Sequence, residues 1–169
     1  MYDELTEVDI RKMQEEIDYR VRELRPQLIE EVQTARAFGD LSENYEYKCA
    51  KQAKNRNESR IRYLERMIRT AKVIEVEADA AGDMVGLFDK VTFLNEKLGR
   101  EMTIQIVTTL RQDALKGLIS KESPVGRAVL GKRVGDRVYV DMGGGKGYYV
   151  QIRAIRKGTD DGSVPIGSF

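Results

Sequence analysis

Two stretches of the chain carry apolar residues at the spacing of one helix face, and only a few residues separate them. In the first, these residues recur every three or four positions: Ile10, Met13, Ile17, Val21, Leu24, Leu28, Val32 and Ala35. The second stretch repeats this period from Tyr47 to Ala71, although Lys54 and Asn57 occupy two of its positions. Because so short a connection favours antiparallel neighbours, the pattern predicts a long antiparallel coiled-coil hairpin over residues 1–74.

Charge and a proline refine this prediction. Residues 1–35 hold ten acidic and five basic residues, whereas residues 48–72 hold nine basic and two acidic residues. The two helices should therefore attract each other where they lie side by side. Pro26 lies inside the first apolar pattern, so the helix should bend or be interrupted near residues 22–26.

After residue 74 the pattern changes. Residues 75–83 are small and acidic and are predicted to form a linker. Short β-rich runs follow at 90–94, 101–107, 137–141 and 148–155. They predict a compact domain over residues 84–157, which makes the whole chain an α+β protein of two domains.

Three segments of the second half have simple interpretations. Residues 123–130 are typical of a short helix with Ser123 as its N-cap and Pro124 at its first position. Residues 143–147 are rich in glycine and lie between two strand-like runs, so they are predicted to be a hairpin turn rather than a phosphate-binding loop. Residues 158–169 are rich in Gly, Ser and Asp and are predicted to be a flexible tail.

The composition excludes several classes of function. The chain has no histidine, which removes His-based triads and most zinc sites. A lone cysteine, Cys49, excludes a disulfide framework and fits a reducing compartment. No window approaches the about 18 apolar residues of a membrane helix, and the acidic start does not resemble a signal peptide. We therefore expect a cytoplasmic protein with no membrane partner.

The predicted hairpin has an acidic tip at residues 37–46. Helix capping explains much of it: Gly39 would end the first helix, and Asp40 with Glu43 would form a capping box for the second. At the other end of the first helix, Thr6 or Asp9 would cap its start. The tip would also lie at the end of a rod about 45 Å long, at about 1.5 Å per residue. Since Mg²⁺ is usually held by one or two carboxylates plus phosphate oxygens and water, such a tip is suited to completing a metal site that another macromolecule supplies.

The tip and its flanks match a family signature. Between the two predicted helices the motif reads Arg36-x-x-Gly39-Asp40-Leu41-x-Glu43-Asn44-x-Glu46-Tyr47. It resembles the tip of the bacterial Gre family of transcript cleavage factors, GreA and GreB. Further matches extend the resemblance over residues 5–156: Arg25-Pro26, Asn57-Glu58-x-Arg60-Ile61 and Glu122-Ser123-Pro124-x-x-Arg127-Ala128-x-x-Gly131-Lys132. The chain departs from the family at Phe38, where histidine is frequent, and at Glu122, where aspartate is expected.

This resemblance implies a transcription elongation factor. Its coiled coil would enter the secondary channel of a backtracked RNA polymerase and stimulate endonucleolytic cleavage of the nascent RNA. Asp40 and Glu43 would share the second, weakly bound Mg²⁺ of the polymerase active site and orient the attacking water. The chain would therefore be a monomeric cleavage-stimulating factor rather than an enzyme, with no cofactor bound stably to it alone.

The resemblance also implies roles for other residues. Arg36 and Lys51 would contact the 3′ segment of the RNA. The tip would be shaped by Gly39, Leu41, Asn44, Glu46 and Tyr47. The second domain would have an FKBP-like fold and would dock at the channel rim through Glu122, Ser123 and Pro124.

Two other functions remain open at this point. A regulator of the same fold could bind the polymerase channel without stimulating cleavage, although the presence of both Asp40 and Glu43 favours cleavage. A helical-hairpin chaperone or a prolyl isomerase would need an apolar hairpin end or an aromatic-lined pocket, and the acidic tip argues against the chaperone.

Overall fold

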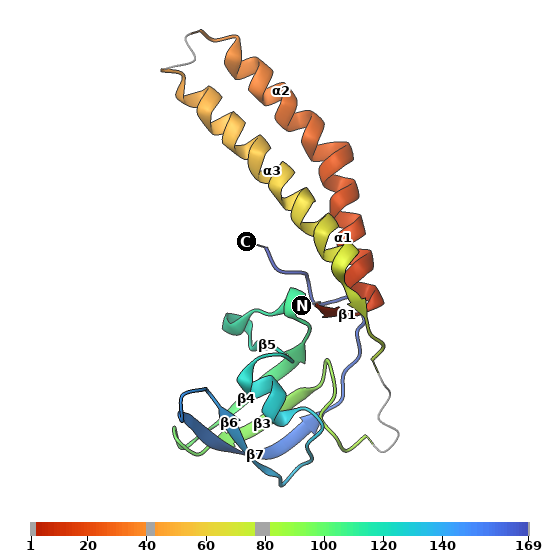
Figure 1. Ribbon diagram of the computed structural model, residues 1–169, viewed down its shortest axis with the longest axis vertical. Coiled ribbons are helices and arrows are strands. Elements are labelled where there is room, and N and C mark those ends of the chain that lie inside the picture. The colour runs from red at the N-terminus through yellow and green to blue at the C-terminus, as the bar shows by residue number, and fades with distance from the viewer. Residues whose placement is uncertain (1–2, 40–42, 77–81, 169) are drawn as a thin grey trace. The chain divides into compact units, whose positions relative to one another are not determined.

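The computed structural model describes residues 3–39, 43–76 and 82–168, which form two compact units. One unit contains Ile10–Ala71, and the other combines Asp3–Asp9 with the chain from Lys72 onward. The first is a helical hairpin and the second contains a curled β-sheet (Figure 1). Both parts of the predicted α+β fold are confirmed.

The boundary between the units differs from the predicted one at residue 74. Strand β1 (Glu4–Leu5) pairs in parallel with β2 (Lys72–Val73), and this pairing places both segments in the sheet-containing unit. Each strand has only two residues, which is too short for an alternating pattern to show in the sequence. The predicted linker at 75–83 falls largely on residues 77–81, which lie outside the described residues.

The hairpin is built from four helical segments in two antiparallel arms. One arm contains α1 (Glu7–Tyr19), a π-helical turn (Arg20–Leu24) and α2 (Arg25–Arg36), and the other is α3 (Tyr45–Thr70). Among the described helices, none is both long enough and apolar enough to cross a bilayer.

The interruption expected near Pro26 is confirmed, and it takes the form of the π-helical turn. Pro26 has no N–H to donate, and just before it the N–H of Arg25 donates to the carbonyl oxygen of Arg20, five residues back. Asn57 of α3 packs against this turn: its amide nitrogen donates to the Arg20 carbonyl oxygen at 3.3 Å, and its amide oxygen accepts from the Arg20 guanidinium at 2.9 Å. The polar seam position at Asn57 therefore has a partner on the opposite arm.

Ion pairs join the two arms, as the opposite charges predicted. The Glu16 carboxylate accepts hydrogen bonds from Arg60 at 2.7 Å and from Arg20 at 2.8 Å. Arg25 forms a bidentate pair with Glu58 at 2.7 and 2.9 Å, although here the basic residue lies on the acidic arm. The two arms are thus joined by specific ion pairs, and the acidic partner comes from the first arm in one pair and from the second arm in the other.

The second unit contains a five-stranded sheet in the order β5-β4-β3-β7-β6. Its strands are β3 (Lys90–Asn95), β4 (Arg100–Val107), β5 (Leu118–Ser120), β6 (Arg137–Asp141) and β7 (Gly147–Arg156). All neighbours are antiparallel except β4 and β5, which are parallel. The four strands expected from the sequence are confirmed, and β5 was missed because it is only three residues long.

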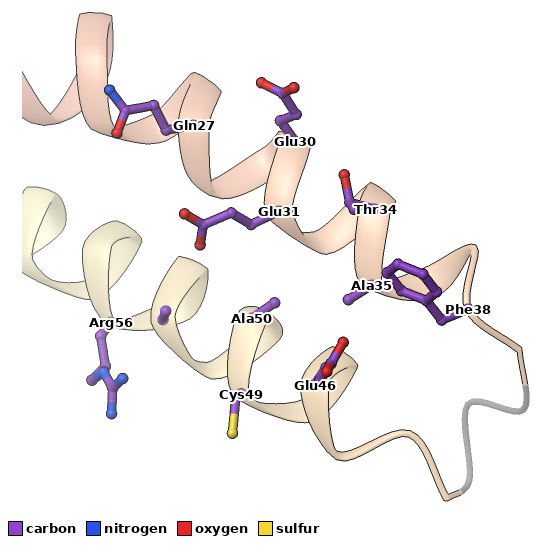
Figure 2. A pocket seen from close by; sticks show the side chains of 11 residues that line it. Gln27, Glu30, Glu31, Thr34, Ala35, Phe38, Glu46, Cys49, Ala50 and Arg56 are labelled. Atoms are coloured by element: carbon purple, nitrogen blue, oxygen red, sulfur yellow. The ribbon is translucent and has the colours of Figure 1, made fainter.

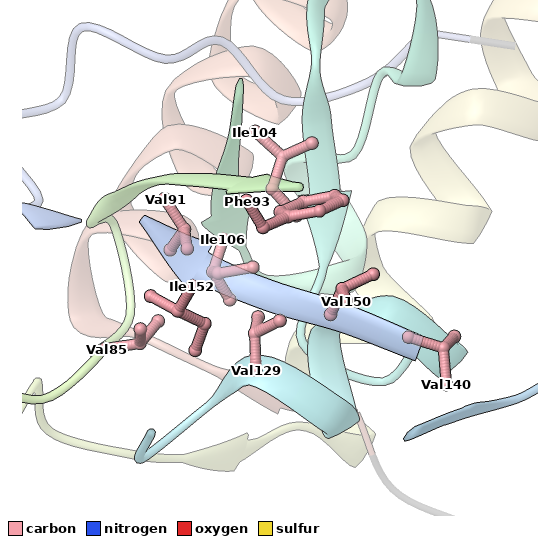
Figure 3. Packing of buried hydrophobic residues seen from close by; sticks show 9 residues of the cluster. All are labelled: Val85, Val91, Phe93, Ile104, Ile106, Val129, Val140, Val150 and Ile152. Atoms are coloured by element: carbon pink, nitrogen blue, oxygen red, sulfur yellow. The ribbon is translucent and has the colours of Figure 1, made fainter. Parts of the chain in front are cut away.

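One face of this sheet holds the core together with the short helix α4 (Pro124–Val129). Figure 3 shows the buried cluster, which consists of Val85, Val91, Phe93, Ile104, Ile106, Val129, Val140, Val150 and Ile152. The predicted glycine-rich turn joins β6 to β7, where the Met142 N–H donates to the Lys146 carbonyl oxygen at 2.8 Å. The domain that the family resemblance calls FKBP-like is thus a mixed sheet with one covering helix.

Helix α1 begins with a reciprocal capping box inside the second unit. The Thr6 N–H donates to Asp9 Oδ2 at 2.9 Å, and the Asp9 N–H donates to Thr6 Oγ1 at 3.3 Å. Both predicted candidates therefore take part, Thr6 as the cap and Asp9 as its partner. Asp9 is completely buried, so its second carboxylate oxygen needs a partner of its own.

That partner is Arg111, whose side chain is fully buried. Its Nε donates to Asp9 Oδ1 at 2.6 Å, and its two terminal nitrogens donate to the Asp160 carboxylate at 2.5 and 2.9 Å. Farther along, the Gly167 N–H donates to the Leu110 carbonyl oxygen at 2.8 Å. The segment predicted to be a flexible tail is therefore anchored, because Asp160 supplies a counter-charge that its local composition did not reveal.

Candidate functional site

The tip of the hairpin is organised by Asn44. Its side-chain oxygen accepts the N–H of Tyr47 at 3.0 Å and so caps α3, while its amide nitrogen donates to the Ala35 carbonyl oxygen of α2 at 2.6 Å. One side chain thus fastens the end of one helix to the beginning of the next. The capping box predicted from Asp40 and Glu43 is wrong, since α3 begins after Asn44. This amide supports the tip-scaffold role that the family resemblance implies.

Glu43 is exposed and lies immediately before this cap. Because Asn44 satisfies the helix end, the Glu43 carboxylate is not used for capping and is available to a partner. Glu46 is exposed in the first turn of α3, where the helix dipole favours a negative charge by about 0.3–1 kcal/mol. Among the tip residues that the structure describes, these two carboxylates are both accessible. Asp40 and Leu41 lie outside the described residues.

The first arm ends just before the tip. Helix α2 ends at Arg36. Gly39 adopts a φ of 125°, a backbone conformation that residues other than glycine rarely adopt. The predicted role of Gly39 in leaving the helix is consistent with this geometry.

A basic group flanks the acidic tip. Arg36 donates a hydrogen bond to the Tyr47 hydroxyl at 3.4 Å, and its guanidinium carbon lies 5.5 Å from the centre of the Tyr47 ring. This hydrogen bond lowers the pKa of the Tyr47 phenol; burial opposes the shift, and the positive charge of Lys51 assists it. The structure therefore brings together Arg36 and Lys51, the two residues predicted to contact RNA, around one tyrosine.

A groove of about 770 Å³ runs between α2 and α3 on approach to the tip. Figure 2 shows the Glu31 side chain extending from α2 into the space between the two ribbons, and the Arg56 side chain on α3. Small side chains at Ala35, Ala50 and Ala53 leave this space between the arms. The two helices are thus less tightly filled here than around the buried Ile61 and Leu64, which lie closer to the base of the hairpin.

The predicted docking loop precedes α4 in the second unit. The Ser123 hydroxyl accepts the Gly126 N–H at 3.0 Å and donates to the Ser120 carbonyl oxygen at 2.7 Å, which confirms Ser123 as the N-cap. Pro124 occupies the first helical position and is exposed, as is Glu122, which pairs with Arg127 at 3.3 Å. The exposed surface of this loop therefore belongs to Glu122 and Pro124, while the Ser123 hydroxyl builds the helix start.

Two aromatic residues at the tip were not singled out as candidate site residues from the sequence. Phe38 follows the end of α2 and Tyr45 begins α3, and they are 72% and 77% exposed. The sequence places Phe38 and Tyr45 next to the acidic residues of the tip. That position alone does not tell whether an aromatic ring is packed in the interior or exposed.

Fold and site together define a two-unit protein that carries accessible carboxylates at the end of a helical hairpin. The chain belongs to the GreA/GreB family of transcription elongation factors. The family model described as "Transcription elongation factor, N-terminal" matches residues 4–73, and the one described as "Transcription elongation factor, GreA/GreB, C-term" matches residues 79–157. The resemblance inferred from the tip motif is thereby confirmed.

Several bacterial proteins are similar to this chain over most of its length. "Transcription elongation factor GreA" of Rhizobium leguminosarum bv. viciae is 44% identical over 82% of this chain and 87% of that protein. The protein of the same name from Agrobacterium fabrum is 43% identical over 87% of this chain and 92% of that protein. Among solved structures, Gfh1 of Thermus thermophilus is 26% identical, with a TM-score of 0.42 over 93% of this chain and all of that one.

Proposed function

We propose that this transcription elongation factor acts on RNA polymerase by stimulating cleavage of backtracked nascent RNA. The coiled-coil hairpin enters the secondary channel of the enzyme, and the tip carboxylates complete its active site. The observation that carries this proposal is the cap at Asn44, which leaves Glu43 exposed at the end of the hairpin. The factor acts as a monomer in the bacterial cytoplasm.

The donor chemistry at the tip fits a magnesium ion of the polymerase. Mg²⁺ takes oxygen ligands and is usually bound by one or two carboxylates together with substrate phosphates and water. Glu43 offers an accessible carboxylate, and Asp40 is its partner by family resemblance. A metal ion held there would lower the pKa of a water molecule and would stabilise the leaving oxygen. Asp40 and Glu43 would hold and orient these groups, so catalysis belongs to the complex and the chain alone is not an enzyme.

The basic group beside the tip suits the RNA strand. Arg36 and Lys51 are exposed cations, and cations next to a nucleic acid bind its phosphates with a salt-dependent affinity. They would hold the extruded 3′ segment near the carboxylates. Glu122, Ser123 and Pro124 would dock on the rim of the channel, with Ser123 acting mainly through the shape of the loop.

The relatives disfavour a regulator that binds the channel without promoting cleavage. They are similar to this chain over most of its length, and each is named transcription elongation factor GreA. The direct test uses a halted elongation complex with RNA labelled at its 3′ end and with Mg²⁺ present or omitted. Added wild-type chain should release a labelled fragment only when the metal is present. Unchanged RNA in both reactions contradicts the proposal.

Variants separate the chemical role of the tip from its structural role. Asp40→Ala and Glu43→Ala should abolish stimulated cleavage while polymerase binding is retained. Glu30→Ala is the matched control, because it removes an exposed carboxylate from α2 without touching the tip. If both tip variants lose binding as much as cleavage, these carboxylates serve the structure of the hairpin instead.

The role of the basic group has its own test. Lys51→Glu should weaken crosslinking to a long extruded RNA more than it weakens polymerase binding. Arg66→Glu reverses an exposed charge on the same helix, α3, far from the tip, and should leave crosslinking unchanged.

For the docking loop, Glu122→Lys should reduce polymerase affinity and leave the hairpin intact.

A further inference from the structure

Two aromatic rings are displayed at the tip although neither contributes to the core of the hairpin. Phe38 and Tyr45 have the largest exposed fractions of any aromatic residue that the structure describes, at 72% and 77%. With Glu43, Asn44 and Glu46 they line a hollow of about 570 Å³.

The two rings lie close in sequence to the hydrogen bonds of Asn44. Asn44 lies next to Tyr45 in the chain and donates to the Ala35 carbonyl oxygen, three residues before Phe38. The same amide therefore bonds both the last turn of α2 and the first turn of α3. Cys49, one turn along α3, raises the pKa of the Tyr45 phenol. Figure 2 shows Phe38 at the end of α2 and Glu46 near it on α3.

The charges around the hollow limit what it can bind. Glu43 and Glu46 would repel a phosphate group, so the sugar-phosphate backbone of a nucleic acid would pass elsewhere, beside Arg36 and Lys51. The flat, uncharged faces of nucleobases meet no such repulsion and stack well on aromatic side chains. Aromatic rings beside a cationic track are the combination that binds single strands with little sequence preference.

We propose that Phe38 and Tyr45 form a stacking platform for unpaired bases of the extruded RNA segment. The rings position the strand while the neighbouring carboxylates meet its scissile region, so Phe38 and Tyr45 are positioning residues. This inference rests on the proposed function, because it takes backtracked RNA as the strand at the tip. A contact of the same rings with the protein wall of the channel is the competing outcome.

The test compares variants that remove a ring with variants that keep it. Phe38→Leu and Tyr45→Leu retain an apolar side chain and remove the aromatic face, whereas Tyr45→Phe retains the face and removes only the hydroxyl. Tyr19→Leu is the matched control, because Tyr19 is an aromatic residue of α1, 52% exposed and remote in sequence from the tip. Circular dichroism of each variant verifies that the helices are intact.

Single-turnover cleavage is measured at saturating factor on two RNAs, one intact and one with abasic nucleotides in the extruded segment. On intact RNA each ring-to-leucine change should slow cleavage by about 5-fold or more, the size expected for one lost stacking contact. Tyr45→Phe and Tyr19→Leu should cleave at the wild-type rate. On abasic RNA the wild-type rate should fall to that of the leucine variants, which should lose nothing further.

Two results overturn the inference alone. One is wild-type cleavage rates for both leucine variants on intact RNA. The other is an equal loss on intact and abasic RNA, which would assign the rings to a protein contact. A wild-type chain that stimulates no cleavage on either RNA refutes the proposed function, and the stacking platform with it.

Discussion

Replacing Asn44 with alanine removes two hydrogen bonds from the tip. Loss of the cap on the Tyr47 N–H costs about 0.5–2 kcal/mol. Loss of the bond to the Ala35 carbonyl oxygen adds about 0.5–1.5 kcal/mol. The hairpin should therefore be destabilised by about 1–3.5 kcal/mol. Each kcal/mol lowers the melting temperature of a unit of this size by roughly 4–8 °C. Thermal unfolding followed by helical circular dichroism measures the change.

Asn44→Asp separates the two contributions. Aspartate is as good an N-cap as asparagine, but its carboxylate has no N–H to donate to Ala35. Its loss of stability should therefore be smaller than that of Asn44→Ala. Because Glu43 precedes the cap directly, the alanine variant should also show slower stimulated cleavage. An unchanged melting temperature for Asn44→Ala would refute the view that this residue clamps the tip.

Three further predictions concern the charged groups. Arg111→Met leaves the carboxylates of Asp9 and Asp160 buried without their cation, so the sheet-containing unit should lose about 3–5 kcal/mol in urea denaturation; a loss below about 1 kcal/mol would contradict the burial of this pair. Asp160→Ala should speed amide hydrogen exchange at Asp9, in the first turn of α1, and leave exchange at the tip unchanged. The hydrogen bond from Arg25 lowers the pKa of Glu58 below its ordinary value of 4.5. The stabilising contribution of this pair is therefore complete above pH 4.5 and is lost as the pH falls through the lower pKa of the folded state. The melting temperature should drop over that acidic range, and less steeply in Glu58→Gln.

Much of the candidate site was accessible from the chain alone. The spacing of the tip motif located Glu43, Arg36 and Tyr47 between two periodic stretches, and local signals located the Ser123 cap of α4. These predictions succeeded because each depends on residues close together in sequence. The assignment of Asp40 and Glu43 as a capping box failed, because Asn44 competes for the same helix end and also reaches α2.

In the fold, too, the features set by local sequence were predicted, whereas contacts between segments distant in sequence were not. Apolar periodicity determined the hairpin, and alternation determined four of the strands, since both patterns express burial along a single element. The pairing of β1 with β2, the contact of Asn57 with the π-helical turn, and the burial of Arg111 between Asp9 and Asp160 depended on the tertiary structure. Each joins segments distant in sequence, and a polar residue looks the same in sequence whether it is solvated or paired in the interior. Local pattern therefore specified the elements and the tip chemistry, while long-range pairing decided where the units divide and which charges are buried.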